Sequence, residues 1–256
     1  MIGAIIGDII GSRFEWNNHR DEEFLLFSEK SHFTDDTVLT IATADCLLRN
    51  RDYRETYQFY AKENPNAGYG GMFHRWIFSS DLKPYQSFGN GSGMRVSPIG
   101  WFFPDLDTTR KEAQKSAEVT HNHPEGIKGA ESIASAIFLS RKGSSKEEIQ
   151  TYIEDNFKYN LKFNFEELKI SYQFDETCQG SIPQAIYCFL VSNSFEDAIR
   201  KSISIGGDSD TIACMTGSIA EAFYKNITEE IKLEAYSRLP ENFLKIIQDF
   251  NRYINH

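Results

Sequence analysis

The sequence has few cysteines and no long apolar run, and each absence excludes a class of protein. Its 256 residues include four cysteines, none in a CxxC pair, so neither a disulfide framework nor a zinc ribbon is expected. No segment approaches the ~20 consecutive apolar residues of a membrane-spanning helix. The apolar N-terminal segment lacks a basic leader and is interrupted by Asp8, so we expect a cytoplasmic protein without a secretion signal.

Basic charge is also scarce. The chain has 27 Lys and Arg residues against 37 Asp and Glu residues, which gives a net charge of −10. Duplex nucleic acid is therefore not expected as a partner, because its phosphates are bound by basic surfaces. The hydrophobic content of 40% is typical of a soluble globular protein, and a chain this long can fold without a metal or a disulfide.

Strand signals are poor, whereas helical periodicity recurs along the chain. Helices are predicted over residues 38–48, 125–141, 144–158, 182–192, 195–204 and 211–224, and over two segments after Thr228. Residues 161–174 alternate only briefly, which is compatible with a strand or with a helix and a turn. No repeat or linker divides the sequence, so we expect an all-α protein in which residues 1–256 form a single domain.

Two short acidic motifs each precede a helix that is predicted to be buried. Residues 33–37 read Phe-Thr-Asp-Asp-Thr, and residues 206–211 read Gly-Gly-Asp-Ser-Asp-Thr. Each could be a simple N-cap, since Asp and Thr cap helices well. One carboxylate is enough for a cap, however, and a second unit charge ~4 Å away adds ~4 kcal/mol of repulsion at an effective dielectric of about 20. A positively charged ligand would relieve that repulsion.

The N-terminal segment adds glycines and further carboxylates. Gly3, Gly7 and Gly11 recur every four residues, which predicts the close approach of another helix. Asp8 and Glu15 are expected on this same apolar helix, where a buried carboxylate is usually paired or functional, although Glu15 could simply be exposed. If Glu15 and both acidic pairs converge, their charge of about −5 would suit two divalent cations, and oxygen ligands favour Mg²⁺ or Mn²⁺ over Zn²⁺.

A glycine-rich loop lies at residues 89–93, which read Gly-Asn-Gly-Ser-Gly. Its backbone N–H groups could bind a phosphate, but it fits neither the P-loop nor the dinucleotide pattern, and a plain turn is equally compatible. Tyr85 and Phe88 could stack on a base or pack in the core. His121 and His123 are a poor chelating pair in a loop, so they are expected to form hydrogen bonds.

Together these motifs resemble those of the ADP-ribosylglycohydrolases, the family of the dinitrogenase reductase-activating glycohydrolase and the ADP-ribosyl-acceptor hydrolases. The likeness covers residues 3–15, 33–37, 68–71, 87–100, 120–130 and 206–222. It implies a compact orthogonal bundle of helices with two Mg²⁺ ions, for which Mn²⁺ could substitute. It also implies hydrolysis of the C1″ glycosidic bond between ADP-ribose and an acceptor, through an oxocarbenium-like transition state.

The resemblance assigns roles to particular residues. The implied metal ligands are Thr34, Asp35, Asp36, Asp208, Asp210 and Thr211. The residues implied to bind the substrate are Gly68, Tyr69, Gly70, Ser87, Phe88, Gly89, Asn90, Gly91, Ser92 and His121. Within these sets Asp210 would bridge the metals, Phe88 would contact adenine and His121 would reach the phosphate side. Glu15 or Asp36 would be the catalytic carboxylate that handles the proton.

Two other functions are compatible with the same residues. One is a pseudoenzyme that binds ADP-ribose, which the presence of every implied metal ligand disfavours. The other is a dinuclear-metal phosphohydrolase acting on a nucleotide, for which paired carboxylates would serve equally. For the hydrolase, the expected partners are an ADP-ribosylated protein or small molecule and the ADP-ribose product, and the chain is expected to be a monomer. The acceptor could be Arg, Ser, a nucleobase or a small molecule.

Overall fold

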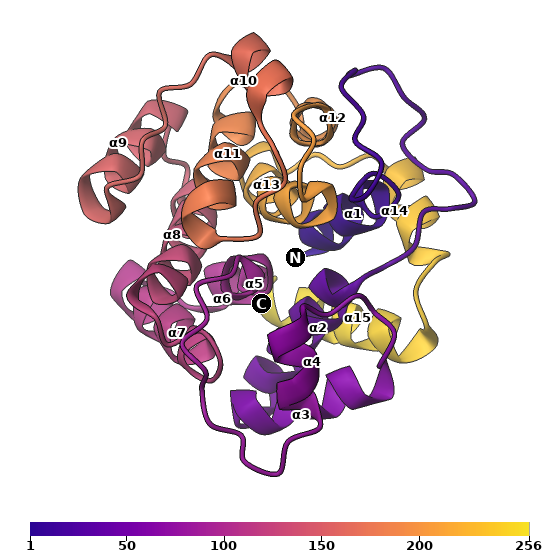
Figure 1. Ribbon diagram of the computed structural model, residues 1–256, viewed down its shortest axis with the longest axis vertical. Helices are drawn as coiled ribbons and strands as arrows, with labels where there is room; N and C mark the ends of the chain where they lie inside the picture. Colours follow the sequence, from indigo (N-terminus) through magenta and orange to yellow (C-terminus); the bar gives the residue numbers. More distant parts are fainter. Residues whose placement is uncertain (256) are drawn as a thin grey trace.

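Helices make up the regular structure of the protein. In the computed structural model, which describes residues 1–255, all the named elements are helices, and the isolated β-bridge joins Gly89 to Thr177. The helices, drawn in Figure 1, are α1 (Ile2–Gly11), α2 (Asp35–Arg49), α3 (Tyr53–Glu63), α4 (Gly71–Ile77), α5 (Gly91–Met94), α6 (Ser97–Phe102), α7 (Leu106–Glu118), α8 (Pro124–Lys142), α9 (Lys146–Phe157), α10 (Phe165–Ser171), α11 (Cys178–Leu190), α12 (Phe195–Ser204), α13 (Ser209–Tyr224), α14 (Glu229–Tyr236) and α15 (Glu241–Ile254). The predicted all-α fold class is therefore confirmed.

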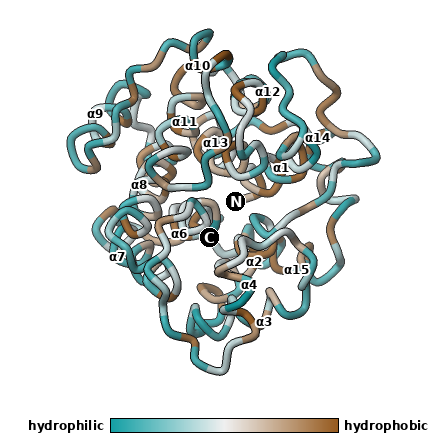
Figure 2. The backbone as a smooth tube through the Cα atoms, in the orientation of Figure 1, coloured by the Kyte–Doolittle hydropathy of each residue, from teal (hydrophilic) through white to brown (hydrophobic). Residues whose placement is uncertain are grey.

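Helix α13 occupies the centre of the core, where it packs against α1, α8, α11 and α12. All of its residues from Ser209 to Ala220 are buried. Figure 2 shows that the outlying helices α7 and α9 are mainly hydrophilic, in keeping with a helix that has only one face on the core. Because α13 starts with the second acidic motif, this central helix also carries a cluster of charge.

The glycines of α1 bring it into direct backbone contact with α13. A Cβ atom added to Gly3 would lie 2.3 Å from the carbonyl oxygen of Gly217, and one added to Gly7 would lie 2.1 Å from that of Ala213. One added to Gly11 would lie 2.4 Å from Cα of Asp210. The predicted close helix approach is thus present, and it fixes α1 relative to the first turn of α13.

Most of the predicted helices are present, but one boundary prediction is wrong. Helix α1 ends at Gly11, so Glu15 lies in the turn that follows and not on the same helix as Asp8. Residues 161–174 could have formed a strand or a helix and a turn. They contain the short helix α10, with non-helical chain on both sides. Ser145 caps α9 in a capping box, and Gly143 ends α8 in the left-handed region with φ 91°.

A membrane-spanning helix is not found in the part of the chain that the structure describes. Within residues 1–255, no helix combines the length and apolar character that crossing a bilayer requires.

Candidate active site

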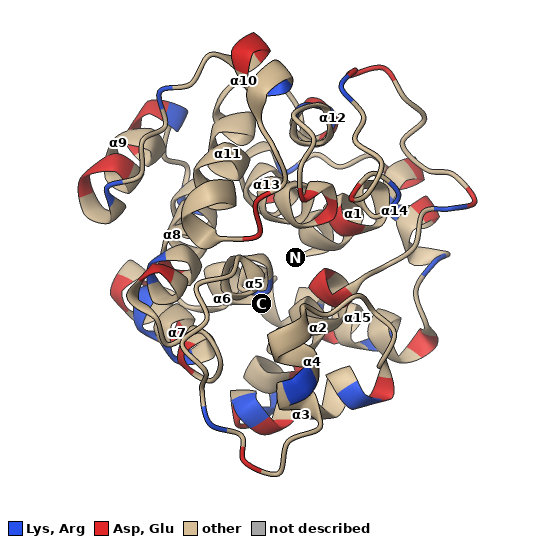
Figure 3. Ribbon diagram, viewed as in Figure 1, with Lys and Arg blue, Asp and Glu red and all other residues tan. Residues whose placement is uncertain are grey.

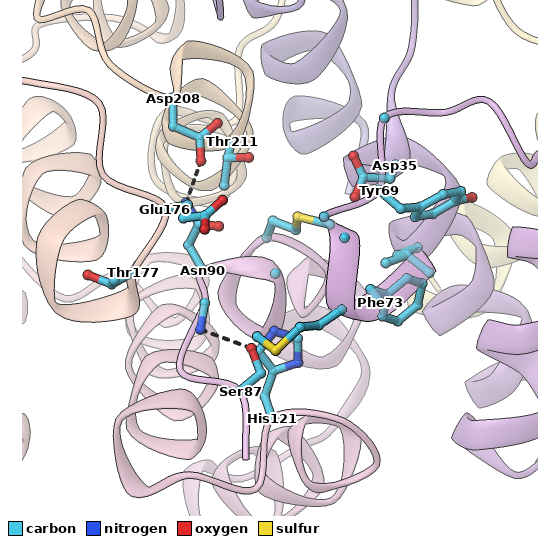
Figure 4. Close-up of a pocket in the computed structure, with 18 of the residues that line it drawn as sticks. Asp35, Tyr69, Phe73, Ser87, Asn90, His121, Glu176, Thr177, Asp208 and Thr211 are labelled. Atoms are coloured by element: carbon cyan, nitrogen blue, oxygen red, sulfur yellow. Dashed lines mark hydrogen bonds between the residues drawn. The ribbon is translucent and has the colours of Figure 1, made fainter. Parts of the chain in front are cut away.

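A cleft of about 600 Å³ opens beside the first turns of α2 and α13. Figure 4 shows labelled side chains pointing into it from several directions, with Asp208 and Thr211 at one end and Ser87 and His121 at the other. Among the residues predicted to bind metal or substrate, the lining includes Glu15, Asp35, Gly68, Tyr69, Gly70, Ser87, Phe88, Gly89, Asn90, Gly91, His121, Asp208, Asp210 and Thr211. The cleft therefore brings together residues from all the motifs singled out in the sequence.

Carboxylates form a cluster at one end of the cleft. Oxygens of Asp8, Asp36 and Asp210 lie within 4.8 Å of one another, and so do oxygens of Glu15, Asp208 and Asp210. Asp210 thus belongs to both groups of three. Figure 3 shows acidic segments of α1, α2 and α13 facing one another near the centre of the molecule. Glu15, Asp36, Asp208 and Asp210 thus converge as the sequence suggested, whereas Asp35 lines the cleft but belongs to neither group.

Asp8 anchors the first acidic motif to α1. Its carboxylate is fully buried and accepts the backbone N–H of Thr34 at 2.9 Å and the Thr34 hydroxyl at 2.7 Å. It also accepts the backbone N–H of Thr37 at 3.0 Å and the Thr37 hydroxyl. With four donors on its two oxygens, Asp8 holds the start of α2 in place. The sequence marked Asp8 as a buried carboxylate but gave it no role in the site.

The N-cap interpretation does not explain the acidic pairs. At α2 the cap is Thr34, whose hydroxyl oxygen accepts the backbone N–H of Asp36 at 3.4 Å. At α13 the N-cap residue Asp208 makes no capping hydrogen bond and instead accepts one from the Asn90 side chain at 2.6 Å. The carboxylates at these helix starts are therefore available for another purpose.

The turn before α13 needs two consecutive glycines. Gly206 and Gly207 have φ of 68° and 80°, values that L side chains adopt only with strain. Arg20 packs against Gly206 and donates to the backbone carbonyls of Tyr172, Lys169 and Ile205. Asn18 accepts the Gly207 N–H at 2.9 Å. These contacts from the segment after α1 fix the direction in which Asp208 points.

Burial and mutual repulsion raise the pKa of the carboxylates in the cluster. Desolvation is the largest cause for Asp35, Asp36 and Asp210, whose pKa values lie well above the ordinary value. The pKa of Glu15 rises to about 7, first from desolvation and then from the charge of Asp208. Within residues 1–255 no Lys or Arg forms an ion pair with any of these groups, so the protein leaves the charge of the cluster uncompensated.

The cluster has the features of a divalent cation site. Oδ1 of Asp36 is buried and has no hydrogen-bond partner within the described chain, whereas Oδ2 lies 3.2 Å from the Thr211 hydroxyl. An unpartnered buried carboxylate oxygen is costly unless something positive binds it. The donor set consists of carboxylate and hydroxyl oxygens, which hard cations prefer. These residues therefore fit the metal site that the resemblance implies.

All but one of the predicted substrate residues line the cleft, and some lie beside the carboxylates, since a Cβ atom added to Gly68 would be 3.5 Å from Oδ1 of Asp35. Phe88 is 43% exposed and packs against His123 at a ring distance of 5.2 Å. Ser92 is fully buried, does not line the cleft, and donates its hydroxyl to the carbonyl oxygen of Gly126 at 2.7 Å. Its hydroxyl therefore stabilises the loop from behind and does not face a ligand.

The cleft also contains residues that the sequence did not single out. Glu176 points into the cleft beside Asn90 in Figure 4. Arg95, which follows the glycine loop by two residues, lines the cleft and is fully buried. Trp16 is 81% exposed at the rim and stacks on Phe174 with ring centroids 5.2 Å apart. Glu176 and Trp16 stand outside the motifs that the sequence offered, and Arg95 lies within residues 87–100 but received no role there, so only the fold could identify their place in the cleft.

Comparison with known proteins decides which family the fold and site belong to. The family model for ADP-ribosylglycohydrolase matches residues 1–252. The chain belongs to the ADP-ribosylglycohydrolase family. Among its relatives, the ADP-ribosylhydrolase ARH3 of Homo sapiens is 27% identical, with 88% of this chain and 84% of the human protein covered. ARH3 of Danio rerio is 29% identical, with coverage of 88% and 81%.

A solved structure supports the fold assignment of this ADP-ribosylglycohydrolase. The structure is titled "ADP-ribosylglycohydrolase-related protein complex" and matches with a TM-score of 0.73 and 18% identity. The match covers 99% of this chain and 95% of the other, so it shows that the whole fold is shared. Family membership also confirms the predicted class of enzyme, a glycohydrolase.

Proposed function

We propose that this ADP-ribosylglycohydrolase cleaves the C1″ glycosidic bond between ADP-ribose and an acceptor, and releases ADP-ribose with the help of two Mg²⁺ ions. The observation that carries the proposal is the pair of carboxylate groups sharing Asp210 at one end of a cleft. The backbone of the glycine loop lies at the other end. An acidic end suits a metal-bound ribose, and a loop rich in N–H groups suits a diphosphate.

The proposed ions would be held by the oxygens that the protein leaves without a positive partner. Asp36 and Asp210 would hold one ion, with Thr34 and Thr211 contributing hydroxyl oxygens. Asp208 and Asp210 would hold the second, and the partly exposed Asp35 would complete the set from α2. When bound, the ions would orient the ribose hydroxyls and lower the pKa of water in the site. Mn²⁺ has similar ligand preferences and would substitute.

Proton transfer is best assigned to Glu15. Of the two carboxylates considered for this role, Asp36 is only 1% exposed and lies beneath the cleft, whereas Glu15 is on its wall and partly exposed. Its place on the cleft wall allows the Glu15 carboxylate to accept a proton from the attacking water. The remaining carboxylates would stabilise the positive charge that develops at C1″ as the bond to the acceptor breaks.

The substrate would lie along the cleft, with its distal ribose at the carboxylates and its diphosphate at the glycine loop. Phe88 would contact adenine, and His121 would face the phosphates from the floor of the loop. The partners would be an ADP-ribosylated protein or small molecule and the ADP-ribose product. Residues from the segment after α1 and from α13 line one cleft, which supports a single domain over residues 1–256.

Mass-spectrometric analysis of products tests this proposal. The protein is incubated with Arg-linked and Ser-linked ADP-ribosyl peptides, with Mg²⁺ and with excess EDTA. Release of ADP-ribose that EDTA abolishes is expected from at least one peptide. Binding of ADP-ribose without release from any acceptor would instead indicate a binding protein. Release of phosphate from a nucleotide would indicate a phosphohydrolase.

A further inference from the structure

Arg95 is a buried cation for which the described chain supplies no counter-charge. Its side chain is fully buried and stacks on Tyr57, with the guanidinium carbon 4.4 Å from the ring centroid. Nη2 donates to the carbonyl oxygen of Ser116 at 2.7 Å and to the hydroxyl oxygen of Thr120 at 3.0 Å. Within residues 1–255, Nε and Nη1 have no hydrogen-bond partner and no carboxylate forms an ion pair with Arg95. Burying a charge without a counter-charge lowers the stability of a protein, so the burial of Arg95 calls for a functional explanation.

Thr120 connects Arg95 to the cleft. Its hydroxyl oxygen accepts from Arg95, because a guanidinium can only donate hydrogen bonds. The same oxygen lies 2.7 Å from Nδ1 of His121. Among the described residues, Nδ1 is the one acceptor within reach of the Thr120 hydroxyl hydrogen. The hydroxyl therefore satisfies both neighbours when it donates to Nδ1.

This arrangement decides which ring nitrogen of His121 carries the hydrogen. When Nδ1 accepts from Thr120, a neutral imidazole must carry its hydrogen on Nε2. Nε2 faces the glycine loop, since a Cβ atom added to Gly91 would lie 3.2 Å from it and one added to Gly89 would lie 3.6 Å away. His121 lines the cleft, and Nε2 has no protein partner within residues 1–255.

We propose that Arg95 and Thr120 are positioning residues that hold His121 in the Nε2–H tautomer, so that it donates a hydrogen bond to an anionic phosphate oxygen in the cleft. The identity of that anion as the diphosphate of ADP-ribose rests on the proposed function. Burial and the Arg95 charge lower the pKa of His121 well below its ordinary value, so the ring is neutral and has only one N–H to direct. The uncompensated charge of Arg95 is offset when the anion binds nearby.

Nuclear magnetic resonance of the ligand-free protein tests the tautomer directly. Long-range ¹H–¹⁵N correlation spectra of protein labelled at its six histidines distinguish Nε2–H from Nδ1–H rings, and a His121→Gln variant assigns the signal. The wild-type protein is expected to show His121 as Nε2–H. Thr120→Val, which keeps the side-chain volume, should release the ring to populate Nδ1–H. Thr120→Ser retains the hydroxyl and should keep the wild-type pattern.

Calorimetry with ADP-ribose measures the consequence for binding. Loss of one hydrogen bond to a charged oxygen predicts a Kd about tenfold higher for Thr120→Val, with Thr120→Ser close to wild type. A wild-type Nδ1–H ring, or a Thr120→Val variant with unchanged tautomer and unchanged Kd, would overturn the proposal. Failure of the wild-type protein to bind ADP-ribose would count against the proposed function, while the spectra of the free protein would still decide the tautomer.

Discussion

The two ends of the cleft carry opposite uncompensated charges. At the α2–α13 end, carboxylates approach one another and have no Lys or Arg partner in the described chain. At the glycine-loop end, the buried guanidinium of Arg95 has no carboxylate partner within residues 1–255. The protein could have paired these charges with each other, but the cleft separates them. The difference makes each end suited to a ligand of opposite charge, which is the basis of the metal and diphosphate sites proposed above.

The largest effect is expected from removing a carboxylate at the acidic end. Asp36→Asn should reduce the rate of ADP-ribose release by more than about 100-fold. Loss of a residue that only hydrogen-bonds to a metal ligand costs about 10- to 100-fold, and Asp36 is proposed to bind the metal directly. In EDTA the same variant should be more stable than wild type by about 2 kcal/mol, because one source of repulsion is gone. Rates by mass spectrometry and urea unfolding measure the two effects.

Asp45 on the same helix provides the matched control for this prediction. Its buried carboxylate is paired with Arg49 at 2.6 Å and with Arg51 at 2.9 Å. Asp45→Asn should therefore lower stability in EDTA and leave the turnover of the folded protein unchanged. If both variants change the free energy of unfolding in the same direction, the conclusion that the carboxylates of the acidic end lack a counter-charge is refuted.

The second effect concerns the helix contact that assembles the acidic end. Gly7→Ala would place Cβ 2.1 Å from the backbone oxygen of Ala213, a rigid neighbour, so about 3 kcal/mol of stability should be lost. Gly71→Ala is the control, because an added Cβ there meets nothing within 4 Å and should change stability by less than about 0.5 kcal/mol. Equal unfolding midpoints for the two variants would contradict the role of α1.

The third effect is confined to the glycine-loop end. Gly91→Ala places a methyl group 3.2 Å from Nε2 of His121, where it would crowd the hydrogen bond that this nitrogen is proposed to donate. ADP-ribose binding, measured by calorimetry, should weaken about tenfold through loss of one charged hydrogen bond. The increase in melting temperature on adding Mg²⁺ should stay as in wild type. A smaller Mg²⁺ effect in this variant would mean that the two ends are not separate.

The smallest effect is the pH dependence of metal-free stability. Because the pKa of Glu15 is raised to about 7 in the folded protein from an ordinary value of 4.5, the folded state binds more protons than the unfolded state between these values. Stability from this group is therefore present below pH 4.5 and is lost as the pH rises through about 7. In EDTA, the melting temperature of wild type relative to that of Glu15→Gln should fall as the pH is raised from 5 to 8. A constant difference would refute the shift.

The sequence predicted elements with strong local signals and could not predict what depends on long-range packing. The predicted ranges 125–141 and 144–158 lie within two residues of α8 and α9, because the cap at Ser145 and the glycine exit at Gly143 are local signals. The extension of α1 to Glu15 was wrong because the apolar pattern continues past Gly11, and no Gly or Pro after it marks the end.

For the site, the two acidic motifs were identified but their convergence was not determined by sequence alone. It depends on the backbone contact between α1 and α13, for which the spacing of Gly3, Gly7 and Gly11 is the one visible signal. Arg95 gave no signal of its own, because a single arginine after a loop is usually exposed and only the fold reveals its burial.

The glycine contact between α1 and α13 also has a consequence for how the chain is made. Residues 2–11 leave the ribosome long before the helix they pack against, which is complete only at residue 224. At ~5–20 residues per second, the roughly 200 intervening residues take about 10–40 s to synthesise. During that time the face of α1 that packs on α13 has no partner and remains open to chaperones and to aggregation. Slow elongation on the ribosome lengthens this exposure, so the yield of folded enzyme depends on translation speed.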